Sequence, residues 1–272
     1  MENAQVPVQS QPQNKLIAEK LSLFRQNYIN FIKDLGVLGE FFSQIPIEEP
    51  PGRQAISPYW LNQYLPSGDA IALCGFLVKH NPAVYIEVGS GNSTKFAKKV
   101  ISHFNLRTKI ISIDPYPRAE IDSLCDEVVR APLQEVPVTL FQKLRQGSIL
   151  FVDGSHRCLQ NSDVTYMFLD VMPNLQPGVI LHFHDIFLPQ DYPISWSDRV
   201  YNEQYLLGVL LLFGSGYEIL YSAYYASHDS QLNAQFESVL RPFLPAKCNC
   251  GGGSLWMRMN KLPVSAPVEI TL

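Results

Sequence analysis

The sequence is poor in charged residues and has no strongly basic segment. Asp, Glu, Lys and Arg make up 17% of its 272 residues, against about a quarter in typical globular chains. The formal net charge is −4, with no lysine- or arginine-rich run. This argues against nucleic acid as a partner, because binding a phosphate backbone requires clustered cations. The shortage of charge leaves extra buried surface, such as a homo-oligomer interface, as one explanation.

Long apolar runs and a secretion signal are also missing. The longest apolar run, residues 205–213, is much shorter than the roughly 20 residues that span a membrane. Residues 1–13 are polar and lack the basic and apolar regions of a signal peptide. We therefore expect no membrane partner and a cytoplasmic location.

Cysteine is scarce and scattered. The five cysteines are Cys74, Cys125, Cys158, Cys248 and Cys250. An odd, dispersed set predicts free thiols in a reducing compartment. Cys248 and Cys250 lie close together, but no second Cys/His pair follows at zinc-site spacing, so we interpret this segment as a loop.

A strand, a glycine turn and a helix follow one another at residues 83–104. Residues 83–88 are apolar except for Glu87, which is typical of a buried parallel strand. Gly89 and Gly91 allow a sharp turn and close approach to a ligand. The free N–H groups of the following helix can bind an anion. The pattern predicts a nucleotide-type binding loop.

Strand and helix patterns alternate after this turn. Further strands are expected at residues 109–113, 126–129, 148–152, 179–183, 217–224 and 254–259. The alternation predicts an α/β fold built from βαβ units with a parallel sheet. The stretch between the last two strands is too short for a confident crossover helix, so an antiparallel closing pair is expected.

The chain divides into three predicted parts. Residues 1–13 read as a disordered tail, 14–66 as an N-terminal helical extension, and 67–272 as a single α/β domain. Within the extension, residues 15–35 predict one amphipathic helix. This helix could form a lid or dimer contact, or pack on its own domain.

Four acidic residues fall at the ends of predicted inner strands. They are Glu87, Asp114, Asp153 and Asp185. Ligands of open α/β sheets bind at the carboxyl ends of the strands, and carboxylates rarely collect in buried positions without a reason. We expect these four side chains to form one functional site.

The first two of these acids narrow the choice of cofactor. Asp114 lies 23 residues after Gly91, a spacing that suits an acid accepting hydrogen bonds from both ribose hydroxyls. Glu87 would repel a nearby pyrophosphate but would suit a ligand ammonium group. An adenosyl ligand with an amino-acid end is therefore favoured over a nicotinamide dinucleotide.

Residues 87–93, Glu-Val-Gly-Ser-Gly-Asn-Ser, together with Asp114, resemble the first two motifs of class I S-adenosylmethionine-dependent methyltransferases. The resemblance covers about residues 67–260. It implies a Rossmann-like, mostly parallel seven-stranded sheet, with an antiparallel last strand and helices on both faces. It also implies S-adenosyl-L-methionine as cofactor, with adenine near residues 131–133. The implied cofactor-binding residues are Glu87, Gly89, Ser90, Gly91, Asn92, Ser93, Asp114 and Asp153.

Residues 152–156 (Val-Asp-Gly-Ser-His) and 177–185 are similar to metal-dependent O-methyltransferases of small molecules. This resemblance implies that Asp153, His184 and Asp185 hold a metal and that His156 is the general base. Those families usually have an acid or amide where this chain has His184. Imidazole favours zinc, iron or manganese over magnesium, so either the metal differs, or none binds and a histidine works alone.

These residues fit methyl transfer to oxygen. A divalent ion lowers a hydroxyl's pKa, and a histidine can take the proton. The predicted function is O-methylation of a small hydroxylated metabolite, with His156 and Asp153 as catalytic residues. The alternatives are a nicotinamide-dependent oxidoreductase and a non-catalytic binding protein of the same fold. Five residues of the segment 186–204 are expected to wall an acceptor pocket: Asp191, Tyr192, Trp196, Tyr201 and Glu203.

Overall fold

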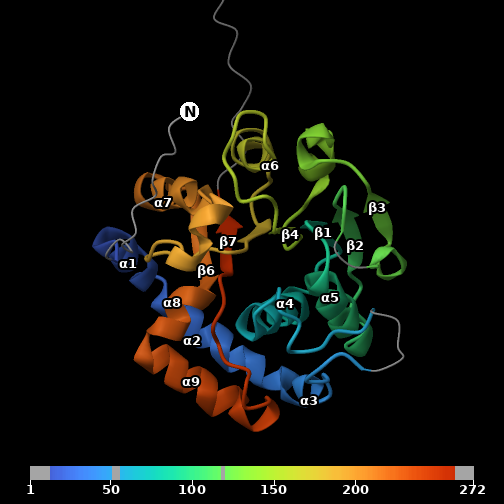
Figure 1. The fold of residues 1–272 in the computed structure, drawn as a ribbon, viewed down its shortest axis with the longest axis vertical. Coiled ribbons are helices and arrows are strands. Elements are labelled where there is room, and N and C mark those ends of the chain that lie inside the picture. The colour runs from blue at the N-terminus through green and yellow to red at the C-terminus, as the bar shows by residue number, and fades with distance from the viewer. Residues whose placement is uncertain (1–12, 51–55, 118–119, 261–272) are drawn as a thin grey trace, which may run out of the picture.

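A seven-stranded sheet forms the centre of the computed structural model, which describes residues 13–50, 56–117 and 120–260 (Figure 1). The predicted disordered tail lies outside these residues except for its last position. The strands are β1 (Val84–Val88), β2 (Lys109–Ile113), β3 (Glu127–Val129), β4 (Ile149–Val152), β5 (Ile180–Phe183), β6 (Tyr217–Ser222) and β7 (Leu255–Met259). Their order is β3-β2-β1-β4-β5-β7-β6. Only β7 runs antiparallel to its neighbours, β5 and β6, which confirms the predicted sheet with its reversed last strand.

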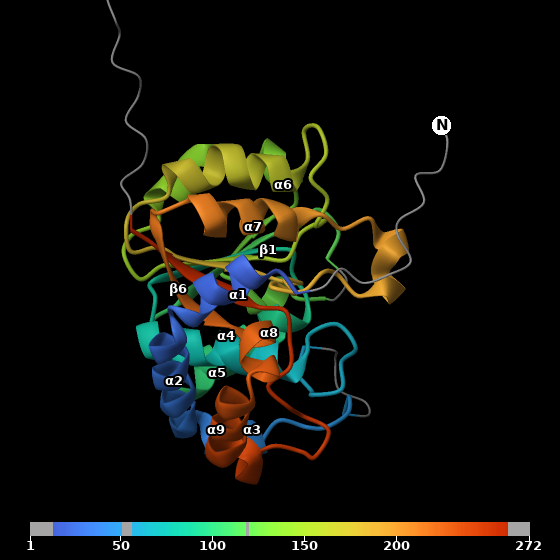
Figure 2. The ribbon, with the colours of Figure 1, turned by 90° about the vertical axis from the view of Figure 1, so that its left-hand side faces the viewer.

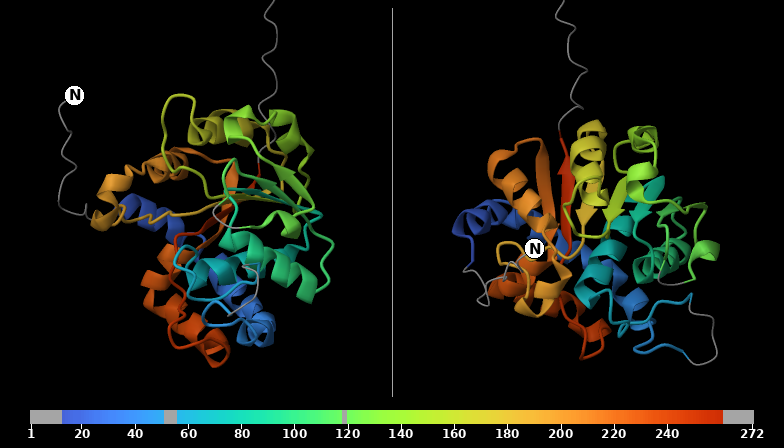
Figure 3. Two further views of the ribbon diagram at one scale, coloured as in Figure 1. Left: turned by 45° about the vertical axis from the view of Figure 1, so that its right-hand side comes forward. Right: turned by 45° about the horizontal axis from the view of Figure 1, so that its top comes forward.

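Helices cover both faces of the sheet (Figure 2). They are α1 (Lys15–Ser22), α2 (Arg25–Asp34), α3 (Gly39–Ser43), α4 (Ser67–His80), α5 (Asn92–His103), α6 (Asp163–Tyr166), α7 (Glu203–Phe213), α8 (Ala223–His228) and α9 (Ser230–Leu240). Helices α6 and α7 lie on one face. Helices α4, α5 and α8 lie on the other, and α2, α3 and α9 form a further layer outside them, as Figure 3 shows from two other directions.

Short helical turns complete the secondary structure. Seven of the described residue ranges form 3-10 turns beside the longer elements, and one forms a π-helical turn directly after α6. The 3-10 turns are Leu35–Leu38, Asp122–Leu124, Leu133–Glu135, Val138–Lys143, Met172–Asn174, Ile194–Arg199 and Arg241–Phe243, and the π turn is Met167–Val171. Within the described ranges, no helix combines the length and apolar character that a membrane span requires.

The amphipathic pattern of α5 explains how the glycine turn is anchored. Its apolar residues Phe96, Ala97, Val100 and Ile101 are all buried, and α5 packs beside α4 under the sheet. Apolar residues spaced by three and four positions lie on one helix face, so these four side chains attach α5 to the core. The start of α5 is thereby fixed at the carboxyl end of β1.

The prediction of one continuous helix over residues 15–35 is wrong. The first helix ends at Ser22 and the next starts at Arg25, because the two parts have different partners. Helix α1 packs against α7, whereas α2 packs against β6 and α9. A straight helix cannot follow both surfaces.

The N-terminal segment shares the core of the sheet. Tyr28 of α2 is fully buried, and Phe31 is 3% exposed. The Phe31 ring stacks on Phe76 of α4 with a centroid distance of 4.4 Å, and Phe76 stacks on Trp256 of β7 at 4.1 Å. Three distant parts of the chain therefore meet in one aromatic column.

Two helices, α8 and α9, occupy the stretch that was expected to lack a confident helix. Their starts are capped by side chains: Ser222 Oγ accepts the N–H of Tyr225, and Asp229 Oδ1 accepts the N–H groups of Gln231 and Leu232. Such caps stabilise a helix start by about 1 kcal/mol. Helix α8 lies on the sheet face that carries α4 and α5, and α9 lies outside it. The chain then returns to the sheet as the antiparallel strand β7.

Parallel pairing places the carboxyl ends of β1, β2, β4 and β5 at one edge. In the register, Val88 lies opposite both Ile113 and Val152, and Val152 lies opposite Phe183. The residues that follow these strands therefore converge, as the sequence pattern predicted.

Candidate active site

A cleft of about 1490 Å³ opens at this edge of the sheet. It gathers nearly all the predicted site residues: Gly89, Ser90, Gly91, Asn92, Ser93, Asp114, Asp153, His156, His184 and Asp185. Glu87 is fully buried behind the glycine turn and is not among the described residues that line the cleft. Pro132 and Leu133, from the segment expected near adenine, also line it.

Glycine is needed at positions 89 and 91 for different structural reasons. Gly89 has a φ of +80°, and a Cβ there would overlap the carbonyl oxygen of Asp153. Only glycine fits such a conformation and contact without strain. A Cβ at Gly91 would meet no described atom within 4 Å. Because Gly91 lines the cleft, its missing side chain leaves space for a ligand rather than for packing.

The start of α5 also faces the cleft. Gly91 precedes the helix, and its N–H donates to Thr94 Oγ1 at 3.0 Å. Asn92 is the first helical residue, and its Nδ2 donates to Asn62 Oδ1 at 3.2 Å. Asn62 lies in the segment before α4, so the glycine turn contacts a second wall of the cleft.

Asp114 is fixed by backbone donors on both carboxylate oxygens. Ser90 N–H donates to Oδ2 and Tyr116 N–H donates to Oδ1, each at 2.8 Å. The first bond links the end of β2 to the glycine turn. Because each carboxylate oxygen can accept a further hydrogen bond, Asp114 can still receive the hydroxyls of a ribose in the cleft.

Glu87 lies in an apolar setting with two hydroxyl donors. Tyr85 donates to Oε1 at 3.0 Å, and Thr94 donates to Oε2. Burial raises the pKa of Glu87 to about 7, although bonds from the Ser93, Thr94 and Tyr85 side chains partly oppose this shift. The carboxyl group can therefore change charge near neutral pH, directly behind the predicted cofactor loop.

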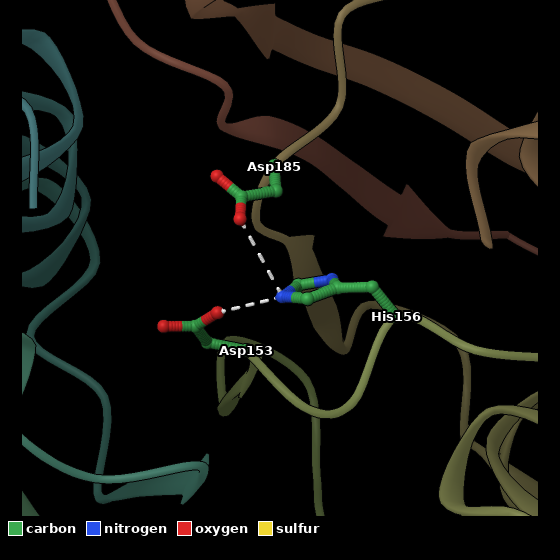
Figure 4. A group of neighbouring side chains, drawn as sticks. All are labelled: Asp153, His156 and Asp185. Carbon is green, nitrogen blue, oxygen red and sulfur yellow. Dashed lines mark hydrogen bonds and ion pairs between the residues drawn. The ribbon is translucent and has the colours of Figure 1, made fainter. Parts of the chain in front are cut away.

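Asp153, His156 and Asp185 converge at the other end of the cleft (Figure 4). His156 Nε2 lies 3.1 Å from Asp153 Oδ1 and 3.6 Å from Asp185 Oδ2. Burial alone would lower the pKa of His156, but hydrogen bonds to Asp153 and Glu203 raise it to about 10. The imidazole thus lies among excess negative charge.

His184 approaches the same two aspartates from β5. Its Nδ1 lies 3.4 Å from Asp153 Oδ1 and 3.4 Å from Asp185 Oδ1. The ring is 2% exposed, and Nδ1 makes no hydrogen bond with any described residue. Burial would lower the pKa of His184, but the Asp153 and Asp185 carboxylates raise it well above its usual value.

These donors fit a divalent cation. Among the described residues, one ligand atom each from Asp153, His156 and Asp185 lie within 4.8 Å of one another. The predicted set has His184 in place of His156, and His184 Nδ1 lies 3.4 Å from an oxygen of each aspartate. Two carboxylates with an imidazole suit zinc, iron or manganese better than magnesium. A cation between them would also satisfy the unpaired Nδ1 of His184.

Two buried carboxylates behind the histidines were missed as parts of this site. Asp69 of α4 contacts His184 Nε2 at 3.1 Å, and Glu203 of α7 contacts His156 Nδ1 at 2.9 Å. The sequence predicts Glu203 as part of the acceptor wall and gives Asp69 no role. In the structure both acids lie in the first turn of a helix, α4 or α7, where acidic residues are common, so no sequence signal separates them.

Aromatic and basic side chains border the open end of the cleft. Trp196 and Tyr201 line it as predicted, together with Arg199 and Arg157. The Arg199 guanidinium lies 3.8 Å from the Trp196 ring centroid, and the Tyr201 ring lies 4.6 Å from that of His156. An acceptor placed here would contact flat apolar surfaces next to His156.

His182 takes no part in this cleft. It is fully buried, its Nε2 lies 2.9 Å from Ser254 Oγ, and its ring stacks on Phe151 at 3.8 Å. Burial lowers its pKa well below the usual value. It is a neutral packing residue of the sheet.

Comparison with known proteins covers part of the chain. A family model described as "Methyltransferase domain" matches residues 86–186. An uncharacterized protein of Archaeoglobus fulgidus is 27% identical over 125 residues, which are 43% of this chain and 57% of that protein. The chain thus matches just over half the length of this curated relative.

A solved structure also resembles the chain. It is that of the plantazolicin methyltransferase BpumL in complex with SAH, with a TM-score of 0.44 and 11% sequence identity. The alignment covers 87% of this chain and 99% of that one.

Proposed function

We propose that the chain uses S-adenosyl-L-methionine to methylate an oxygen of a small hydroxylated metabolite. The methyltransferase-domain match of residues 86–186 and the strand order of the whole sheet support this proposal. The observation that carries the proposal is that one cleft joins two sites. The glycine turn with Asp114 lies at one end, and Asp153 with two histidines lies at the other. A methyl donor and an acceptor oxygen must meet in one line, and such positioning supplies much of the rate.

The cofactor end has the required space and acceptors. Gly91 leaves room against the turn, and Asp114 offers carboxylate oxygens to the ribose hydroxyls. Glu87 acts from behind the turn, through its charge rather than by lining the cleft. Its ionised form favours a ligand ammonium group over a pyrophosphate, which is the reason to prefer this cofactor over a nicotinamide.

Asp153, His184 and Asp185 would hold a divalent cation at the acceptor end. Such a cation orients an acceptor hydroxyl and lowers its pKa. The backbone of Asp153 also packs directly against Gly89 of the turn. This contact fixes the acceptor site relative to the methyl donor. Trp196 and Tyr201 give the acceptor an aromatic wall.

His156 is the proposed general base. Its Nε2 points to the carboxylate pair, and its Nδ1 is held by Glu203. The negative charges around it raise its pKa to about 10. A cation bound by Asp153 and Asp185 would offset these negative charges and lower the pKa of His156. His156 would therefore accept a proton best when the cation is bound.

Calorimetric titration with S-adenosylhomocysteine tests the cofactor assignment. We expect binding in the micromolar range by the full chain. Titration with NADH, followed by its fluorescence, tests the oxidoreductase alternative. Tight NADH binding without S-adenosylhomocysteine binding would overturn the proposal.

Methyl transfer to a panel of catechols, sugars and other hydroxylated acceptors, with and without Mn²⁺, tests the reaction. Asp153→Ala and His156→Ala should each reduce turnover by at least about 100-fold. Asp170→Ala and His228→Ala, at exposed positions outside the cleft, are matched controls. Normal turnover in the two site variants would refute the roles of Asp153 and His156.

A further inference from the structure

A buried carboxylate lies behind each of the two imidazoles that face Asp153 and Asp185. Glu203 is 1% exposed and Asp69 is fully buried. Neither lines the cleft among its described residues, so neither can contact a substrate there. Their contacts instead determine which nitrogen of each ring faces the cleft.

Glu203 holds His156 at the start of α7. The Glu203 carboxylate lies 2.9 Å from His156 Nδ1. The His156 carbonyl oxygen accepts the N–H groups of Asn202 at 2.9 Å and Glu203 at 3.2 Å. His156 also has a φ of +58°, a costly conformation for a residue with a side chain. Backbone and ring are thus both fixed, with Nε2 directed at the aspartates.

Asp69 holds His184 by its other nitrogen. Asp69 Oδ2 lies 3.1 Å from His184 Nε2 and accepts the Gly253 N–H at 2.9 Å, while Oδ1 accepts the Ser254 N–H at 2.8 Å. A carboxylate that already accepts two backbone N–H groups requires a donor from the ring, so His184 keeps a proton on Nε2 when a cation lies at Nδ1. Nδ1 is left to face the aspartates.

The glycine run before β7 makes this contact possible. A Cβ at Gly252 would overlap the Asp69 carboxylate, and one at Gly253 would lie 2.9 Å from the Asp185 Cα. The chain therefore passes close over both acids. Glycine is therefore required at positions 252 and 253 by these close contacts, in a segment that the sequence predicts only as a loop.

We propose that Asp69 and Glu203 are positioning residues for the two histidines of a divalent cation site. Each accepts the N–H of one imidazole and thereby fixes the opposite nitrogen: Nδ1 of His184 would bind the cation, and Nε2 of His156 stays free to act as the base beside it. A carboxylate behind a ligating histidine fixes its tautomer and orientation in this way. The inference rests on the cation proposed above, and it assigns His184 and His156 to opposite tautomers.

The tautomers can be measured directly on the full chain labelled with ¹⁵N-histidine. Two-bond ¹H–¹⁵N correlation spectra after addition of one equivalent of Zn²⁺ should show His184 protonated on Nε2 and His156 protonated on Nδ1. His184→Gln and His156→Gln spectra assign the signals among the six histidines. The reverse tautomer at either ring, or no response of either ring to Zn²⁺, would overturn the inference. This NMR measurement needs no variant of Asp69 or Glu203.

Zinc affinity, measured by competition with a chelating dye, tests Asp69, and turnover tests Glu203. Asp69→Asn should weaken Zn²⁺ binding about 10- to 100-fold, whereas Glu203→Ala should lower turnover with little change in Zn²⁺ affinity. Glu203→Gln should retain most of the turnover, because its amide oxygen still accepts from His156 Nδ1. Glu218→Gln, a carboxylate paired with Arg258 in the sheet, is the control and should bind as wild type. Unchanged Zn²⁺ affinity in Asp69→Asn would contradict the role of Asp69, and unchanged turnover in Glu203→Ala would contradict that of Glu203.

The same samples separate this inference from the proposed function. S-adenosylhomocysteine titration reports on the cofactor end alone. Normal cofactor binding with the wrong tautomers would overturn only the positioning roles. Correct tautomers without cofactor binding would overturn only the methyl-transfer proposal.

Discussion

Gly89 packs directly against the backbone of Asp153: a Cβ on the glycine would overlap the Asp153 carbonyl oxygen. The contact joins the turn after β1 to the end of β4, which are neighbouring strands. It also fixes the distance between the proposed cofactor loop and the proposed cation site. A change at this one position should therefore affect both ends of the cleft.

Alanine at Gly89 should destabilise the chain and abolish cofactor binding. The φ of +80° alone costs an alanine about 1–3 kcal/mol, and the overlap with Asp153 adds to this cost. Chemical denaturation should show the loss of stability, and calorimetry with S-adenosylhomocysteine should show no binding. A variant as stable as wild type would contradict the packing role of Gly89.

Alanine at Gly91 should separate binding from stability. This position has no described atom within 4 Å of an added Cβ, so the free energy of unfolding should change by no more than about 0.5 kcal/mol. The methyl group would enter the cleft and weaken S-adenosylhomocysteine binding. Unchanged affinity in a stable Gly91→Ala variant would show that the ligand does not approach this part of the turn.

Replacing Asp114 by Asn should weaken S-adenosylhomocysteine binding about 10- to 100-fold, because hydrogen bonds to a charged group contribute about 1.5–3 kcal/mol. An amide also cannot accept both backbone N–H groups of Ser90 and Tyr116. Asp126→Asn is the matched control, since Asp126 accepts the Ile110 N–H at the other end of β2. Equal losses in both variants would point to general damage to the sheet edge.

The stability of the chain should depend on pH through Glu87. Burial raises its pKa from 4.5 to about 7, so between these values the folded chain keeps a proton that the unfolded chain has lost. Stability therefore falls as pH rises from about 4.5 to 7, by about 3 kcal/mol for this group. Glu87→Gln should remove this part of the fall in denaturation experiments. An identical pH profile in the variant would exclude a raised pKa.

Cofactor binding should respond to the same group with the opposite sign. The ionised form of Glu87 attracts an ammonium group, and its fraction rises from about one tenth at pH 6 to about nine tenths at pH 8 for a pKa of about 7. Affinity for S-adenosylhomocysteine should then increase by up to about tenfold over this range. Calorimetry at several pH values checks this, and Glu87→Gln should flatten the dependence.

The N-terminal helices should be required for the stability of the sheet. Phe31→Ala removes the outer ring of the column that continues through Phe76 to Trp256 and should cost about 3–5 kcal/mol. Phe213→Ala, at a ring that is 84% exposed, should change stability by no more than about 0.5 kcal/mol. Similar denaturation midpoints in the two variants would indicate that the extension folds separately from the sheet.

The parts of the structure that follow from local pattern were predictable. Buried strands, the glycine turn and the acids at strand ends all have short-range signals. Parallel pairing then brings Asp114, Asp153 and Asp185 to one edge without further information. The break in the helix after Ser22 was not predictable, because it depends on two surfaces that only the folded chain presents.

The two carboxylates behind the histidines could not be predicted either, because their contacts join residues far apart in the sequence. Asp69 lies 115 residues before His184, and Glu203 lies 47 residues after His156. Each looks like a first-turn acid of its own helix. Glu87 shows the opposite case. Its position in the motif is clear from the sequence, but its full burial and its hydrogen bonds from Tyr85 and Thr94 depend on side-chain packing.

The position of β7 has a consequence for the order of folding. This strand lies between β5 and β6, yet it follows both in the chain, so during synthesis neither can complete its pairing until residues 255–259 have emerged. Non-local pairing of this kind is slow and exposes strand edges. Asp69 meets Gly253 and Ser254 only when β7 inserts. Folding and maturation of the His184 site are therefore one event, and a nascent chain that lacks β7 should be unable to retain a cation.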